Sequence, residues 1–121
     1  MGNLKVFSRF SPNFYKFKRK KKEIKFIIIH YTGMHSEVEA INHLMDKNSQ
    51  VSCHYLINQK GKIIKFVSEK HIAWHAGKSC WKNLKNLNSQ SIGIELVNPG
   101  HEYGYKNFPS QQILVLIKLL N

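Results

Sequence analysis

The sequence lacks long hydrophobic runs, and it contains few acidic residues and only two cysteines. No apolar stretch approaches the roughly 20 residues that a membrane-spanning helix requires, which excludes a transmembrane segment. The first residues interleave Lys5, Arg9 and Lys16 with aromatic residues, whereas a signal peptide needs an uninterrupted apolar region after a basic start. We therefore expect a cytoplasmic protein, with the cell envelope as the alternative.

The cysteine content also restricts the fold. Cys53 and Cys80 are too far apart for a CxxC metal-binding pair, and two cysteines do not make a disulfide framework. We expect reduced thiols, with Cys53 buried as a small hydrophobic residue. A chain of 121 residues is long enough for one hydrophobic core.

Acidic residues are absent from the first part of the chain. Residues 1–22 contain eight Lys or Arg, so 11 basic and seven acidic residues, a net charge of +4, remain for the rest. Runs of like charge such as Lys16–Lys22 are commonly solvated, and we expect a basic arm at 1–22 followed by one domain at 23–121. Binding of the arm to nucleic acid or anionic lipid is the alternative, and we expect no specific nucleic-acid partner.

An apolar strand that ends in polar residues occupies Lys25–Gly33. Its four consecutive apolar residues, Phe26–Ile29, favour a strand covered on both faces. His30 follows at the carboxyl end, where ligands and catalytic groups collect in sheets of this kind. A histidine in that position is also commonly a hydrogen-bonded structural residue.

Two amphipathic helices are predicted. Ser36 and Glu39 form a capping box, which marks the start of the first helix. The second helix is predicted over Ser110–Asn121. The apolar stripes expected to face the sheet are Val38, Ile41, Leu44 and Met45 in the first helix and Ile113, Leu116, Ile117 and Leu120 in the second.

Further strands are indicated by alternation. Val51–Ile57 alternates and is followed by a glycine-containing turn and the apolar segment Lys62–Val67, which predicts a β-hairpin. Ile92–Val97 also alternates, so that Glu95 shares a face with Gly93. The intervening residues 70–90 show no clear periodicity, which is typical of a surface loop with a binding role.

Four motifs occur together in one order: His30–Gly33, Val51–Tyr55, Ala73–Gly77 and Ser91–Leu96. From about Ser11 to Asn121 the sequence resembles the zinc-dependent N-acetylmuramoyl-L-alanine amidases of the AmpD and AmiD type, relatives of phage amidases and animal peptidoglycan recognition proteins. The resemblance implies an α/β fold with a central mixed β-sheet flanked by helices. It also implies hydrolysis of the amide between N-acetylmuramic acid and L-alanine of peptidoglycan or muropeptides, by a protein that we expect to be monomeric.

The resemblance also implies residue roles. His30 would be the first zinc ligand, and Glu95 would be the general base that takes a proton from water and passes it to the leaving amine. Outside its motif, Glu95 would be interpreted as a solvent-facing strand residue. Trp74 and His75 would line the substrate groove, although a packed tryptophan beside a hydrogen-bonded histidine is the alternative. His54 would support the site through hydrogen bonds without binding the metal.

The remaining zinc ligands of the family, a histidine and an aspartate or cysteine, together with an assisting lysine, would lie beyond Asn121. A catalytic zinc takes three protein ligands, so one histidine is insufficient. We therefore expect a C-terminally incomplete amidase domain that is inactive as given, with a non-catalytic peptidoglycan-binding module as the alternative. Four other histidines match no ligand position and are interpreted as surface residues: His35, His43, His71 and His101.

Overall fold

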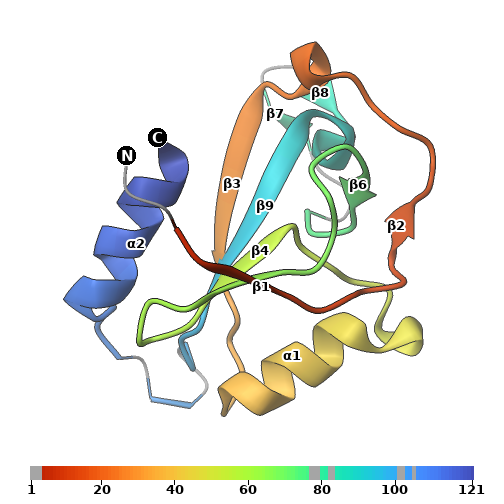
Figure 1. Cartoon of the computed structure of the whole chain (residues 1–121). Helices are drawn as coiled ribbons and strands as arrows, with labels where there is room; N and C mark the ends of the chain where they lie inside the picture. Colours follow the sequence, from red (N-terminus) through yellow and green to blue (C-terminus); the bar gives the residue numbers. More distant parts are fainter. Residues whose placement is uncertain (1–3, 77–79, 82–83, 101–102, 105) are drawn as a thin grey trace.

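A computed structural model describes residues 4–76, 80–81, 84–100, 103–104 and 106–121. A five-stranded mixed sheet lies at its centre, with one helix on each side (Figure 1). The strand order is β1-β5-β4-β9-β3, and only β4 and β5 are antiparallel neighbours. The strands are β1 Val6–Ser8, β3 Phe26–Tyr31, β4 Tyr55–Ile57, β5 Ile63–Lys65 and β9 Ser91–Leu96. This arrangement confirms the predicted fold class.

The smaller elements lie around this sheet. Two short antiparallel pairs form between β2 and β6 and between β7 and β8, and three 3-10 turns connect the larger elements. Neither helix in the described part of the chain is long and apolar enough to cross a bilayer. The elements are β2 Phe14–Tyr15, β6 Ile72–Ala73, β7 Cys80–Trp81, β8 Leu84–Lys85, α1 Glu37–Met45, α2 Ser110–Leu120, η1 Lys21–Glu23, η2 Lys47–Ser49 and η3 Leu87–Gln90.

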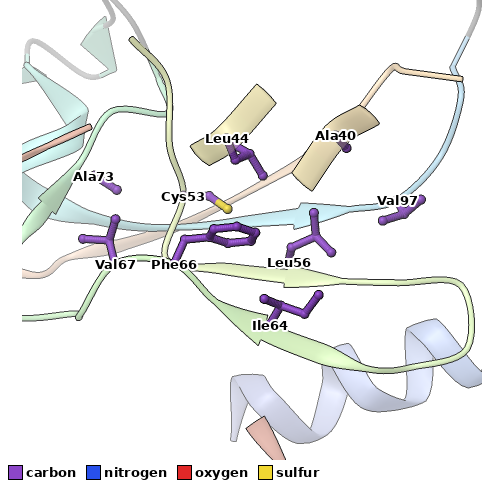
Figure 2. Close-up of a cluster of buried hydrophobic side chains, with 9 residues drawn as sticks. All are labelled: Ala40, Leu44, Cys53, Leu56, Ile64, Phe66, Val67, Ala73 and Val97. Atoms are coloured by element: carbon purple, nitrogen blue, oxygen red, sulfur yellow. The ribbon is translucent and has the colours of Figure 1, made fainter. Parts of the chain in front are cut away.

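The two faces of the sheet carry separate hydrophobic clusters. On one face Ala40 and Leu44 of α1 pack towards Leu56 and Ile64, as Figure 2 shows. On the other face Leu116 of α2 packs against a cluster that includes Ile57, Ile63 and Ile94. Full burial of one such aliphatic side chain contributes about 1.5–3 kcal/mol. Cys53 is buried in the α1-side cluster as predicted.

The predicted hairpin is confirmed as β4 and β5, with Ile57 paired to Ile63. Its loop is closed by Asn58, whose Oδ1 accepts hydrogen bonds from the backbone N–H groups of Lys60 and Lys62 at 3.0 and 2.8 Å. Gly61 has φ +86°, a conformation that favours glycine.

The prediction that the strand at 26–29 is covered on both faces is wrong. β3 is the last strand of the described sheet, and its side chains alternate between partly buried and exposed. Ile29, for example, is 45% exposed. Helix α2 packs over Ile57 of β4, Ile63 of β5 and Ile94 of β9, so the same face of β3 keeps its contact with solvent.

The prediction of a solvated basic arm is wrong for several residues of 1–22. β1 pairs in parallel with β5, and the guanidinium of Arg19 is buried against backbone carbonyls. Its Nε donates to Glu69 O at 2.9 Å and its Nη1 donates to Asn88 O at 3.1 Å. Hydrogen bonds of this kind compensate for removing a cation from water. The lysines of Lys16–Lys22 are exposed, as predicted, and the domain boundary at 22 stays a prediction.

Both helices are confirmed, but their buried stripes differ from the prediction. Ser36 caps α1 by accepting a hydrogen bond from Glu39 N at 3.1 Å. Val38 is nevertheless 66% exposed, while Ala40 is buried beside Leu44.

In α2, Gln112 takes a buried position and Ile117 does not. The amide Nε2 of Gln112 donates to Ile57 O and Val97 O at 2.9 and 3.2 Å. These bonds to the ends of β4 and β9 turn the polar side chain inward and shift the stripe around the helix.

Candidate active site

His30 and Glu95 lie side by side at the carboxyl ends of two parallel strands. The register of β3 and β9 pairs His30 with Glu95 directly. Because side chains alternate along a strand, Glu95 and Gly93 face the α1 side of the sheet while Ile94 faces the α2 side. The structure therefore brings together the predicted metal ligand and the predicted general base.

A pocket of about 200 Å³ opens over this pair. Its walls come from the end of β3, from α1, from the segment before β4, and from β9. The lining residues are His30, Tyr31, Thr32, Met34, Ala40, His43, Leu44, Val51, Ser52, His75 and Glu95.

The carboxyl group of Glu95 has an unusual proton affinity. Burial raises the pKa of Glu95 from 4.5 to about 8, because its charged form is poorly solvated. Leu56, its direct neighbour on β4, is fully buried and contributes to this apolar environment. A carboxyl with a pKa near the working pH can both take and return a proton.

His75 contacts His30 through its imidazole. The distance from His75 Nδ1 to His30 Nε2 is 3.1 Å, and His75 Nε2 lies 3.0 Å from Ser91 Oγ. Ser91 Oγ donates to Leu87 O at 2.7 Å, so its oxygen accepts from His75 Nε2–H. His75 Nδ1 is then the acceptor, and His30 donates from Nε2 and keeps its lone pair on Nδ1.

Both of these imidazoles are neutral near pH 7. Burial lowers the pKa of His75 to about 3, with smaller effects from His30, His54 and Arg19. Burial also lowers the pKa of His30. A neutral imidazole is the form that can act as a hydrogen-bond acceptor or a metal ligand.

Gly93 makes room for this arrangement. A Cβ atom at Gly93 would lie 2.4 Å from Cγ of His75, so any other residue would displace the ring. The sequence places Gly93 beside Glu95 on one face, and the structure fills the space above it with the imidazole of His75.

His54 lies behind the site and does not line its pocket. Its Nδ1 accepts from Gly93 N at 3.0 Å, and its Nε2 lies 2.9 Å from His71 O, so Nε2 carries the proton. The ring is fully buried, and burial lowers its pKa to about 4. His54 thus fixes the strand on which His75 rests and Glu95 is carried.

The structure separates the two residues that were predicted to form one wall. His75 lines the pocket of Glu95, whereas Trp74 lines a second pocket. The backbone between them is held by Ser52 Oγ, which accepts from Trp74 N at 2.9 Å, and by Asn88 Oδ1, which accepts from His75 N and Ala76 N at 3.2 and 2.8 Å.

Sequence reasoning missed part of the lining. His43 was interpreted as a surface residue, and it is exposed, but it also lines the pocket together with Ala40 and Leu44. The spacing of three and four residues along α1 could have placed these side chains on one face. Ser52 and Asn88 gave no signal, because their roles depend on contacts distant in the sequence. His101 lies outside the described residues.

The donor atoms present do not complete a zinc site. A catalytic zinc is held by three protein ligands. His30 offers Nδ1, but both ring nitrogens of His75 are engaged with His30 and Ser91. The part of the chain that the structure describes contains no group of three His, Cys, Asp or Glu residues positioned to hold a metal ion.

Comparison with known proteins identifies relatives that share both sequence and fold. The N-acetylmuramoyl-L-alanine amidase AmiD of Escherichia coli (strain K12) is 40% identical over an alignment that covers 79% of this chain and 38% of AmiD. A structure of E. coli AmiD in complex with the substrate anhydro-N-acetylmuramic acid-L-Ala-D-gamma-Glu-L-Lys matches with a TM-score of 0.70 and 38% identity, covering 80% of this chain and 41% of that chain. AmpDh3 from Pseudomonas aeruginosa matches with a TM-score of 0.73 and 29% identity, covering 86% and 47%.

These alignments show that the chain spans about two-fifths of the length of AmiD. A family model described as N-acetylmuramoyl-L-alanine amidase matches residues 20–121, most of the chain. This match includes both strands that carry His30 and Glu95. The chain therefore belongs to the N-acetylmuramoyl-L-alanine amidase family.

Proposed function

We propose that this chain supplies His30 and Glu95 to an N-acetylmuramoyl-L-alanine amidase, which hydrolyses the amide between N-acetylmuramic acid and L-alanine of peptidoglycan or muropeptides. The supporting observation is the buried carboxyl of Glu95, paired in register with His30 in one pocket. The structure of AmiD with a muramyl peptide supports the same class of substrate.

Glu95 is the residue that moves the proton. Amide hydrolysis requires a group that takes a proton from the attacking water and delivers one to the leaving amine. Because burial brings the pKa of Glu95 to about 8, its charged and neutral forms are both accessible near neutral pH. His75 orients His30 through the bond between Nδ1 and Nε2.

Zinc dependence is part of this proposal. His30 would be one ligand through Nδ1, and donors outside the described residues would complete the set. We also keep the predictions of a monomer and of a cytoplasmic location, which size-exclusion chromatography with light scattering and cell fractionation would test.

The test is hydrolysis of anhydro-N-acetylmuramic acid-L-Ala-D-γ-Glu-L-Lys in the presence of ZnCl₂ by the chain extended past Asn121, where the remaining zinc ligands are expected. Release of the tripeptide is followed by mass spectrometry. Glu95→Gln should slow release by roughly 10²–10⁴-fold, the usual contribution of general acid–base catalysis. Glu39→Gln, an exposed glutamate on α1, is the matched control and should leave the rate unchanged. A rate that survives Glu95→Gln or removal of zinc by a chelator would contradict the corresponding assignment.

A non-catalytic peptidoglycan-binding module is the second candidate. The observation in its favour is that the described residues contain no complete set of metal donors. It predicts that the chain binds the muramyl peptide in calorimetry without releasing tripeptide, that Glu95→Gln keeps the affinity, and that Trp74→Ala loses it. Tripeptide release by the chain extended past Asn121 would rule this candidate out.

A further inference from the structure

Lysines gather at the amino ends of β3 and β9, the end of the sheet opposite to Glu95. A pocket of about 520 Å³ there is lined by Lys18, Arg19, Lys21, Ile24, Glu69 and Lys70. A hollow of about 360 Å³ is lined by Lys22, Glu23, Lys25 and Gln90. All the lysines of these two cavities are exposed. We call Lys18, Lys21, Lys22, Lys25 and Lys70 the basic surface.

The basic surface is built on a buried anchor. Arg19 is 6% exposed, its backbone N–H donates to Lys70 O at 2.8 Å, and its Nε donates to Glu69 O at 2.9 Å. These bonds join the segment around Lys18 to the segment around Lys70, although the two are about 50 residues apart in the sequence. The backbone under the lysines is therefore fixed, while their side chains stay in water.

The two acidic residues of these cavities are each engaged by a neutral donor. Glu69 accepts a hydrogen bond from the hydroxyl of Tyr55. The Oε1 atom of Glu23 accepts one from the backbone N–H of Lys20 at 2.7 Å. The five lysines of the basic surface outnumber these two carboxylates. A fixed excess of exposed positive charge attracts a surface or polymer of negative charge.

Apolar side chains adjoin the lysines. Phe17 directly precedes Lys18 and is 63% exposed, and its ring stacks with that of Tyr15, which is 51% exposed, at 5.9 Å between centroids. Ile24 is partly buried in the wall of the larger cavity. The interface of a bilayer accommodates both kinds of group, because rings and lysine stems enter the boundary of the acyl chains while ammonium groups stay among the headgroups. A soluble anion provides no such apolar phase.

We propose that the basic surface docks on an anionic lipid bilayer, with the lysine ammonium groups among the lipid phosphates and the ring of Phe17 at the headgroup boundary. The inference does not depend on the proposed function, because none of these residues lines the Glu95 pocket.

The architecture gives the docked domain an orientation. Strand β3 spans about 17 Å from Phe26 to Tyr31, at about 3.3 Å per residue. Figure 1 shows β3 and β9 running side by side from the end with the basic surface towards α1. His30 and Glu95 lie at the far end of these strands. A bilayer bound at the basic surface therefore leaves the Glu95 pocket on the side of the domain that faces away from the lipid.

The experiment is co-sedimentation of the full chain with vesicles made of equal parts phosphatidylglycerol and phosphatidylcholine, compared with vesicles of phosphatidylcholine alone. Binding should be saturable on the anionic vesicles, should weaken as NaCl is added, and should be absent on the neutral ones. Lys18→Gln, Lys21→Gln and Lys70→Gln should each weaken binding about fivefold, the contribution of one lysine near an anionic bilayer. Absence of binding to the anionic vesicles at low salt would overturn the inference.

Lys47→Gln is the matched control, because Lys47 is an exposed lysine in η2, directly after α1 and away from the basic surface. It removes the same charge and should leave the affinity unchanged. An equal loss in Lys47→Gln would mean that the vesicles respond to net charge alone, and it would overturn the assignment of the surface. Circular dichroism of each variant excludes unfolding as the cause of lost binding.

The apolar part of the inference has its own test. Phe17→Ala should weaken vesicle binding to a similar extent as loss of one lysine, and Phe17→Trp, which keeps a ring, should retain it. Duplex DNA and inorganic phosphate, each at the same phosphate concentration and ionic strength as the vesicles, should bind more weakly than the vesicles do. Tighter binding of the duplex would assign the surface to nucleic acid, and tighter binding of phosphate would make it a site for small anions. Either result would overturn the inference.

Discussion

The two faces of the central sheet differ in what they bury. The face under α2 is built from aliphatic side chains, with Ile57, Ile94 and Leu116 in one cluster. The face under α1 also has an aliphatic cluster, but at the end of β3 and β9 it carries an acid and two contacting imidazoles. A single strand, β9, serves both faces through alternate residues.

This comparison shows how a small domain keeps a polar site desolvated. Partial burial raises the pKa of Glu95 to about 8, which means that the charged form opposes folding above its ordinary pKa of 4.5. The side chains on the opposite face are aliphatic, so their removal from water favours folding. The aliphatic face therefore offsets the destabilisation that the site introduces.

The largest expected effect is on the aliphatic face. Ile94→Ala should lower the free energy of unfolding by about 2–5 kcal/mol, the range for truncating a buried aliphatic residue, as measured by urea denaturation. The adjacent substitution Glu95→Gln should leave stability at pH 8 equal to or above that of the wild type, because it removes a poorly solvated carboxylate. Equal losses from the two substitutions would contradict the contrast between the faces.

A pH series tests the polar face through His54. Its folded-state pKa of about 4 lies below the ordinary 6.5, so the unfolded chain takes up the proton first as the pH falls. Its contribution is fully present above about pH 6.5 and is lost towards pH 4. The stability advantage of the wild type over His54→Gln should thus shrink by about 3 kcal/mol between pH 7 and pH 4.

Glu95 titrates in the opposite direction, but it is present in both proteins, so its contribution cancels in this difference. Urea denaturation at each pH gives the two free energies of unfolding. A difference that does not change with pH would show that His54 is not buried in its neutral form.

A smaller effect on stability is expected at Gly93, where the ring of His75 lies against the strand. Gly93→Ala should lower the free energy of unfolding by about 1–3 kcal/mol, because the new Cβ would lie 2.4 Å from Cγ of His75. In the His75→Ala background, Gly93→Ala should lower the free energy of unfolding by less than it does in the wild type, because the imidazole that the new Cβ would meet is gone. Purely additive effects in chemical denaturation would mean that the ring does not rest on Gly93.

The smallest effect is expected at the open edge of the sheet. Ile29→Thr should change the free energy of unfolding by no more than about 0.5 kcal/mol, because Ile29 is 45% exposed. The matched substitution Ile94→Thr, at its direct partner on β9, should be strongly destabilising. A large loss for Ile29→Thr would show that this edge is covered in solution.

Several elements could be predicted because their signals are local. The helix start at Ser36, the turn at Gly61 and the alternation of β9 depend on neighbouring residues only, and all three are confirmed. Of the predicted capping box, the structure shows the bond from Glu39 N to the Ser36 hydroxyl. The short strands β1, β2 and β6 were missed, because two or three residues give no measurable period. Burial of Arg19 was missed as well, since its acceptors lie 50 to 70 residues away along the chain.

The sequence by itself determined which residues alternate on each strand, and so which of them could share a face with Glu95. It also carried the four motifs that place the chain in its family. Only the tertiary structure decided that His75 rests on Gly93 and contacts His30, while Trp74 turns to a different pocket. The reason is physical: side-chain alternation follows from backbone geometry within one strand, whereas contacts between segments depend on strand register and on which distant partners satisfy buried polar groups.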